Sequence, residues 1–234
     1  MLEIAVFNIE SALLAAEAGA DRLELCENPS EGGTTPSYGT LKMVREKVHI
    51  PMFPIIRPRG GDFLFSEEEF AVMKKDVELC KQLQFEGVVI GLLNADGTVD
   101  EARTRELVTI AYPMEVTFHR AFDRTADPFA AMETIIACGC QRILTSGQVP
   151  NAMDGKELIK QLIEKAGDRI IILPGSGVRS SNSKALAAFT GAVELHSSAR
   201  KLAASTMVTH KQSMNEELVS VTVDVEEIRK IKAF

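Results

Sequence analysis

The feature that most constrains this chain is the alternation of eight short apolar runs with segments of helical character. Each run has four to six residues, and the runs cover residues 2–7, 22–26, 52–57, 87–92, 115–119, 142–145, 169–173 and 192–196. Strands joined through helices pair in parallel, and roughly 250 residues are typical of a barrel of eight such units. The 234 residues therefore predict a single-domain TIM (β/α)8 barrel that spans residues 1–234.

Local signals support helices between the runs. Ser66 and Glu69 form a capping box, and Asp127 precedes Pro128 at the start of another segment. A glycine turn recurs before the strands, for example at Gly139, as expected for a repeated unit in which each helix ends before the next strand.

Composition excludes several classes of partner. The net charge is −7 and no block of Lys and Arg interleaves with aromatic residues, which argues against nucleic acid or an anionic membrane as a partner. No apolar run of about 18 residues and no basic leader is present, so a cytoplasmic protein is expected. Four cysteines are too few for a disulfide scaffold and are expected to be free thiols.

Residues 203–219 are polar and show no clear period. They predict a mobile loop before a last short helix that begins near Asp224.

Charged and polar residues occupy alternate positions at the strand ends. Residues two apart share a face, which groups Glu24 with Cys26, Glu115 with His119, and Glu194 with His196. Pointing inward, they would put carboxylates below the barrel mouth, and buried carboxylates need partners. Arg57 and Arg59 are the predicted partners, and the same guanidinium groups would hold an anionic substrate. A structural network that fills the barrel is the alternative.

The fifth run ends in a histidine followed by an arginine and an aspartate. His119, Arg120 and Asp123 are expected to form a general acid/base cluster, although an ion-paired loop would have the same composition. The candidate catalytic residues are Arg57, Arg59, His119, Arg120, Asp123, Glu24 and Glu194.

Small residues follow the last three runs, at the end of the barrel where active sites are built. Backbone N–H groups of such loops can hold phosphate. The candidate substrate- or phosphate-binding residues are Ser146, Gly175, Ser176, Gly177, Ser197 and Ser198.

Cys26 closes a strand and stands at the predicted mouth. A thiolate suits a soft ion such as Cu(I), and His119 and His196 are the candidate ligands beside it. A single cysteine can equally be a small buried apolar residue.

Several long motifs together carry a family resemblance. They are Leu23-Glu24-Leu25-Cys26, residues 32–37 (GGTTPS), residues 56–63 (IRPRGGDF), residues 118–123 (FHRAFD) and Gly175-Ser176-Gly177. The chain resembles the CutC family of copper homeostasis proteins through most of residues 1–200. The resemblance implies a cytoplasmic TIM barrel that binds Cu(I) as a homo-oligomer, a dimer or a tetramer, without an organic cofactor.

Two functions stay open at this point. The resemblance favours copper homeostasis with Cu(I) bound at the barrel mouth. The residue chemistry favours an enzyme of unknown reaction on a small anionic substrate, phosphorylated compounds included, with any copper role indirect or absent. A barrel that serves only as a scaffold would leave the charged strand ends unexplained.

Overall fold

The computed structural model describes residues 1–233 and contains the predicted barrel. Its parallel strands are β1 (Leu2–Val6), β2 (Arg22–Leu25), β3 (Met52–Pro54), β4 (Gly87–Ile90), β5 (Glu115–Phe118), β6 (Arg142–Thr145), β7 (Ile171–Pro174) and β8 (Leu195–Ser197). They pair in the orders β3-β2-β1-β8 and β4-β5-β6-β7. A parallel bridge between Ile55 and Val89 joins β3 to β4, and β7 lies against β8. The strands therefore follow the chain order around a barrel.

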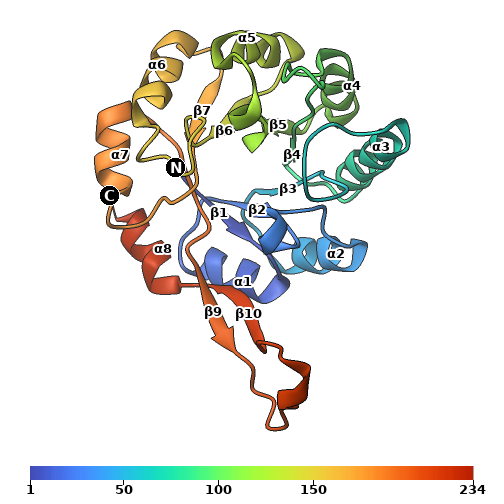
Figure 1. The fold of residues 1–234 in the computed structure, drawn as a ribbon, viewed down its shortest axis with the longest axis vertical. Helices are drawn as coiled ribbons and strands as arrows, with labels where there is room; N and C mark the ends of the chain where they lie inside the picture. The colour runs from blue at the N-terminus through green and yellow to red at the C-terminus, as the bar shows by residue number, and fades with distance from the viewer. Residues whose placement is uncertain (234) are drawn as a thin grey trace.

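Helices form a ring outside these strands (Figure 1). They are α1 (Ile9–Glu17), α2 (Tyr38–Lys47), α3 (Glu67–Gln82), α4 (Glu101–Ala111), α5 (Pro128–Cys138), α6 (Lys156–Ala166), α7 (Ser183–Thr190) and α8 (Val225–Lys232). Short 3-10 turns occur at Pro29–Glu31, Arg120–Arg124 and Gln212–Met214. The capping box of Ser66 and Glu69 is confirmed at the start of α3, and Asp127 caps α5 as expected.

Buried apolar side chains form two separate clusters, because alternate strand residues face opposite sides. The large cluster includes Leu25 and Ile56 and fills the space between barrel and helices. The small cluster consists of Cys26, Phe53, Ile55 and Val89, with Phe7 packed against it. Leu25 and Cys26 are neighbours in sequence but belong to different clusters, so Cys26 faces the barrel interior.

The last strand of the barrel begins later than the sequence predicted. It covers Leu195–Ser197 instead of residues 192–196. Val193 is 71% exposed, and its carbonyl accepts a hydrogen bond from the N-terminal ammonium group. Val193 is therefore a surface residue that precedes β8, although its apolar side chain resembled part of a strand.

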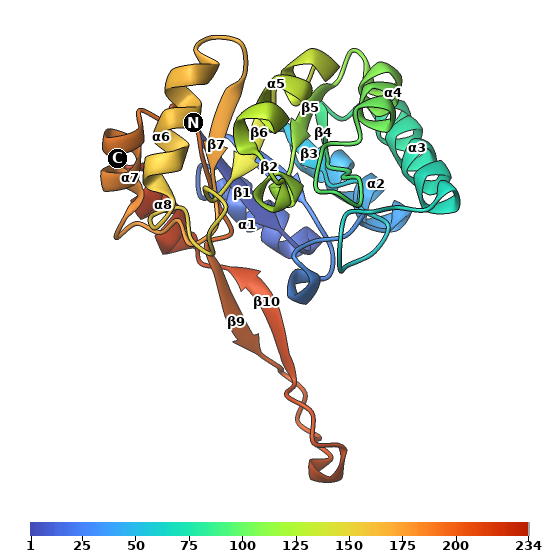
Figure 2. The same ribbon diagram turned by 45° about the horizontal axis from the view of Figure 1, so that its top comes forward.

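A β-hairpin projects from the barrel between β8 and α8 (Figure 2). It pairs β9 (Arg200–Ala204) with β10 (Val219–Val223) in antiparallel register, and residues 205–218 form its tip. Residues 203–219 were predicted to form a loop. The paired strands β9 and β10 that flank and overlap the ends of this range were not predicted. Mobility of the tip stays a prediction.

None of the helices in residues 1–233 is long and apolar enough to cross a bilayer.

Candidate functional site

A cavity of about 490 Å³ opens at the end of the barrel where the strands have their C-termini. It gathers residues that lie far apart in the sequence, from Ala5 to Arg200. Ten predicted site residues line it: Glu24, Cys26, Arg57, His119, Arg120, Ser176, Gly177, His196, Ser197 and Ser198. The parallel topology explains this, since each strand delivers its last inward side chains to the same end.

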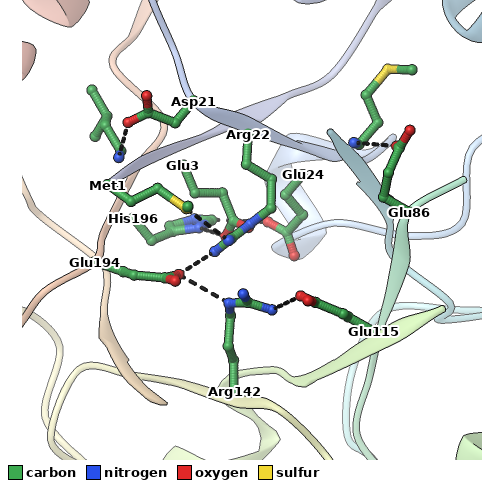
Figure 3. A network of polar contacts seen from close by, with 12 residues as sticks. Met1, Glu3, Asp21, Arg22, Glu24, Glu86, Glu115, Arg142, Glu194 and His196 are labelled. Atoms are coloured by element: carbon green, nitrogen blue, oxygen red, sulfur yellow. Dashed lines mark hydrogen bonds and ion pairs between the residues drawn. The ribbon is translucent and has the colours of Figure 1, made fainter. Parts of the chain in front are cut away.

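Below the cavity, buried ion pairs fill the barrel (Figure 3). Arg22 binds Glu3 and donates a 2.6 Å hydrogen bond to Glu194. Arg142 donates to the same Glu194 oxygen at 3.0 Å and binds Glu115. Glu115 is the first residue of β5, so this pair lies at the end of the barrel opposite the cavity. Both guanidinium groups also lie over one aromatic ring, that of Phe53. Glu24 and Glu194 are therefore buried inside the barrel as expected, whereas Glu115 is about half exposed. Glu194 pairs with Arg22 and Arg142, and Glu115 pairs with Arg142, so the expected partners Arg57 and Arg59 are wrong.

His196 connects this floor to the cavity. Its Nδ1 lies 2.7 Å from Glu3 Oε1, and its Nε2 lies 3.7 Å from Glu24 Oε2 (Figure 3). Burial opposes a charge on the ring, but the Glu3 hydrogen bond and the charges of both glutamates outweigh burial, so the pKa of His196 is raised. Burial is likewise outweighed at Glu3, where His196 and Arg22 lower the pKa to about 2.

Glu24 differs from the other barrel glutamates. Within residues 1–233 it has no arginine partner, whereas Glu3, Glu115 and Glu194 each bind one. Burial raises the pKa of Glu24 to about 7 against the opposing charge of His196. A carboxyl group with that pKa at a cavity wall can accept and return a proton near neutral pH.

Cys26 stands beside Glu24 on the same face of β2. Burial, followed by the charge of Glu24, raises the pKa of the thiol well above its usual value. All four cysteines are free and buried, as predicted from their number.

His119 presents a neutral ring. Its Nδ1 accepts a 3.1 Å hydrogen bond from the Ala121 N–H, which places the ring proton on Nε2. Burial, followed by the charge of Arg57, lowers the pKa of His119 to about 3. The Nε2 atom has no hydrogen-bond partner among residues 1–233. The ring fits only because residue 91 is glycine, since a Cβ there would lie 2.3 Å from Nδ1.

Arg57 organises the loops around the cavity. Its terminal nitrogens donate to the carbonyls of Glu31, Gly33 and Gly61, and its guanidinium lies 4.9 Å from the centre of the Phe63 ring. No carboxylate of the described chain forms an ion pair with it, so its hydrogen bonds go to backbone carbonyls of these loops, and it also lines the cavity.

Arg120, Asp123 and Ser146 form a cluster at the rim. Arg120 donates to Asp123 at 2.7 Å and to the Ser146 hydroxyl at 2.8 Å, and Asp123 also accepts from Thr145 at 2.5 Å. His119 was predicted to belong to this cluster but does not contact it through hydrogen bonds, because its Nδ1 accepts from the Ala121 N–H. Of this cluster only Arg120 lines the cavity.

Other predicted residues lie outside the cavity lining. Arg59 points away and binds Glu69 of α3 at 2.6 Å, and Glu194 belongs to the floor. Gly175 underlies the site, because a Cβ there would lie 2.5 Å from Leu144 and 3.1 Å from His196.

Two further cations that were not predicted from the sequence line the cavity, Arg179 and Arg200. Neither forms an ion pair within residues 1–233, and Arg179 donates only a 3.3 Å hydrogen bond to the Arg200 carbonyl. Beside them, the backbone N–H groups of Ser176, Gly177 and Val178 have no acceptor in that range. We call these two side chains and three N–H groups the anion site. Arg179 lies two residues after the Gly175-Ser176-Gly177 loop, which was the available signal.

The sequence model of the CutC family matches residues 1–201, which include every residue of this cavity. The chain belongs to the CutC family. A family protein CutC from Chromobacterium violaceum is 53% identical over 207 residues, which cover 88% of this chain and 84% of that protein. A human protein named copper homeostasis protein cutC homolog is 47% identical over 92% of this chain and 78% of its own length.

Solved structures agree with this assignment. A CutC crystal structure from Streptococcus agalactiae has a TM-score of 0.81 and 30% identity, and the match covers 85% of this chain and 98% of that one. Phosphoribosyl anthranilate isomerase from Thermotoga maritima matches 99% of this chain and 96% of its own with a TM-score of 0.61. At 15% identity, this second likeness concerns the fold alone. The predicted TIM barrel is confirmed.

The residues of the cavity fit a Cu(I) centre poorly. In the described part of the chain, no three His, Cys, Asp or Glu side chains come together as metal ligands. Cys26 is the sole sulfur-bearing residue in the cavity lining, and burial keeps its thiol protonated, whereas Cu(I) prefers several soft sulfur ligands.

Proposed function

We propose that this protein is an enzyme that acts on a small anionic substrate, phosphorylated compounds included, in the cavity at the C-terminal end of its barrel. The observation that carries the proposal is the anion site. Arg179 and Arg200 line the cavity without an ion-pair partner in residues 1–233, although the chain as a whole has a net charge of −7.

The electrostatics of the cavity support an anion. Arg57, Arg120, Arg179 and Arg200 line it, and the carboxyl group among them, Glu24, has a raised pKa. Arginine side chains next to free backbone N–H groups bind phosphate or carboxylate oxygens through charge-assisted hydrogen bonds. Ser197 at the end of β8 and Ser198 directly after it also line this part of the cavity, which supports their proposed role in holding phosphate.

Acid/base chemistry is the second requirement of such an enzyme. Glu24 and His196 stand 3.7 Å apart at the cavity wall, and Glu3 holds the far side of the histidine ring. This arrangement supports Glu24 as the group that exchanges protons with the substrate and His196 as the positioning residue behind it.

Phosphate binding by isothermal calorimetry tests the proposal, with inorganic phosphate and sn-glycerol 3-phosphate as probes. We expect saturable binding to the wild-type protein and at least about tenfold weaker binding to the variant R179Q/R200Q, since each charge-assisted bond contributes about 1.5–3 kcal/mol. The control R229Q removes an exposed arginine on α8 that pairs with Glu226. Equal affinity in all three proteins would contradict the proposal.

The second candidate is a role in copper homeostasis with Cu(I) at Cys26 and His119 or His196. The names of the human and mouse relatives favour it. Competition with a Cu(I) chelator on reduced protein tests it, with C26S as the variant and C138S/C140S as the matched control. Tight binding lost only in C26S would support this candidate, and weak binding that is the same in every variant would remove it.

We further propose a cytoplasmic homo-oligomer, either a dimer or a tetramer. Four buried free thiols support a reducing compartment. Exposed apolar side chains on the hairpin, among them Leu202, Val208 and Met214, support contact with a second subunit. Light scattering on the purified protein gives the mass directly.

A further inference from the structure

His119 carries a hydrogen-bond donor that the protein does not use. The side chain lines the cavity and is 4% exposed, and its Nε2–H has no acceptor within residues 1–233. A buried donor without an acceptor destabilises the folded protein, so a partner from outside the described chain is expected for it. A ligand oxygen in the cavity meets that requirement.

The donor belongs to a neutral ring, which limits what it can do. The Ala121 N–H donates a 3.1 Å hydrogen bond to Nδ1, and Arg57 places a positive charge near the ring. His119 therefore cannot serve as a base at Nδ1 or as a ready source of protons. A neutral imidazole N–H is suited to polarising a carbonyl and stabilising the oxyanion that forms from it.

A base stands elsewhere on the same cavity lining. Glu24 comes from β2 and His119 from the end of β5, and both line the cavity. The groups packed around Glu24 are Cys26 and Arg22 on its own strand, Glu3 on β1 and His196 on β8. None of the arginines of the floor binds Glu24, so its carboxylate is free to accept a proton from a ligand.

We propose that the substrate is a small phosphorylated α-hydroxy carbonyl compound, and that Glu24 removes a proton from the carbon next to the carbonyl while His119 Nε2–H binds the carbonyl oxygen. This inference rests on the proposed enzyme function, because the phosphate occupies the anion site. The 490 Å³ cavity has room for such a compound.

The step balances without a further reactant. The C–H bond breaks and its proton moves to Glu24, while the electron pair forms a C=C bond. The carbonyl π pair moves to the oxygen, and the resulting enediolate is hydrogen-bonded by His119. The proton returns from Glu24 to the former carbonyl carbon, the proton of the neighbouring hydroxyl group passes to the first oxygen, and the second oxygen becomes the new carbonyl. This completes an isomerisation in which no electrons are gained or lost overall.

Binding of an enediolate analogue tests this inference. The probes are phosphoglycolohydroxamate, which mimics the enediolate, and sn-glycerol 3-phosphate, which has the phosphate but no carbonyl. We expect wild type to bind the analogue at least about 100-fold more tightly than glycerol phosphate, as transition-state analogues do. H119L should reduce that ratio by about 100-fold, the loss typical of one oxyanion donor.

Three further variants separate the possible outcomes. H119Q keeps an N–H donor and should retain more of the ratio than H119L, E24Q should lower the ratio, and R179Q should weaken both probes alike. If wild type binds both probes equally and R179Q weakens both, the enediolate proposal is wrong and the anion site stands. If neither probe binds, the proposed function and this inference fail together.

Discussion

Two buried residues of the cavity have opposite effects on stability as pH changes. His119 has a folded pKa of about 3 against 6.5, so the unfolded chain binds the extra proton and stability rises with pH between these values. Glu24 has a folded pKa of about 7 against 4.5, so the folded chain binds the extra proton and stability falls with pH in that range. Between pH 4.5 and 6.5 the two effects oppose each other.

Removing either residue should therefore expose the effect of the other. In E24Q, the free energy of unfolding should rise with pH by up to about 1.4 kcal/mol per pH unit between 4.5 and 6.5. In H119L it should fall with pH over the same interval. Urea titrations at four pH values measure both slopes, and the double variant is the control with neither group. Parallel slopes in the two single variants would contradict this account.

Gly91 makes room for the His119 ring, and an added methyl group should displace it. In G91A the new Cβ would lie 2.3 Å from Nδ1, so the bond from the Ala121 N–H is lost and stability drops by about 1–3 kcal/mol. The matched control is G39A in helix α2, where the nearest atom lies 3.9 Å away and alanine favours the helix. Thermal unfolding compares the two; a G91A protein as stable as wild type would refute the packing argument.

At the scale of elements, the floor of the barrel depends on ion pairs between distant strands. R22M should cost about 3–5 kcal/mol of stability, because it leaves Glu3 and Glu194 buried with fewer partners. R169M removes an exposed pair with Glu133 on the surface and should cost less than about 1 kcal/mol. Urea unfolding at pH 7 measures both, and similar losses would mean that burial does not set the value of these pairs.

The local patterns of the strands predicted the barrel and its inward-facing residues, but they did not predict which distant residues pair with one another. Alternation placed Glu24, Cys26 and His196 on inward faces, because side-chain direction is a local property of a strand. The bond between Glu3 and His196 joins residues 193 apart in sequence, and that between Arg22 and Glu194 joins residues 172 apart. Which buried glutamate receives which arginine depends on barrel closure, so Arg57 and Arg59 were chosen wrongly.

The missed residues have a similar cause. Arg179 and Arg200 follow strand ends, but nothing local distinguishes them from arginines that pair at the surface, as Arg59 does with Glu69. What distinguishes them is that neither forms an ion pair within residues 1–233, which is a property of the folded chain. The paired strands β9 and β10 lie mostly outside residues 203–219, and the strict alternation of Val219-Ser220-Val221-Thr222-Val223 was a local signal for β10 that was not used in the prediction.

At the scale of the whole molecule, removal of the hairpin tip should leave the stability of the barrel almost unchanged. Replacing residues 205–218 by a two-residue Asn-Gly turn joins Ala204 to Val219, which already face each other in the ladder. The melting temperature should change by less than about 4 °C, equivalent to roughly 1 kcal/mol, because the removed residues lie outside the barrel core. Calorimetry measures this change.

The same shortened protein tests the proposed oligomer. If the exposed apolar side chains of the tip hold subunits together, its mass in light scattering should fall to that of a smaller assembly. A matched control is V72S, which removes an exposed apolar side chain on α3 and should leave the mass unchanged. An unchanged mass in the shortened protein would exclude the tip as the contact.

The ion pairs of Arg22 and Arg142 close one end of the barrel beneath the cavity, which makes the site a dead end. A molecule that enters must leave by the route it came, and so must the water that it displaces. If the protein is the enzyme proposed above, a product still in the cavity would block the next substrate, and product inhibition should be competitive. Entry to the cavity and exit from it therefore depend on its rim. Arg200 lies at this rim and is also the first residue of β9, at the base of the hairpin.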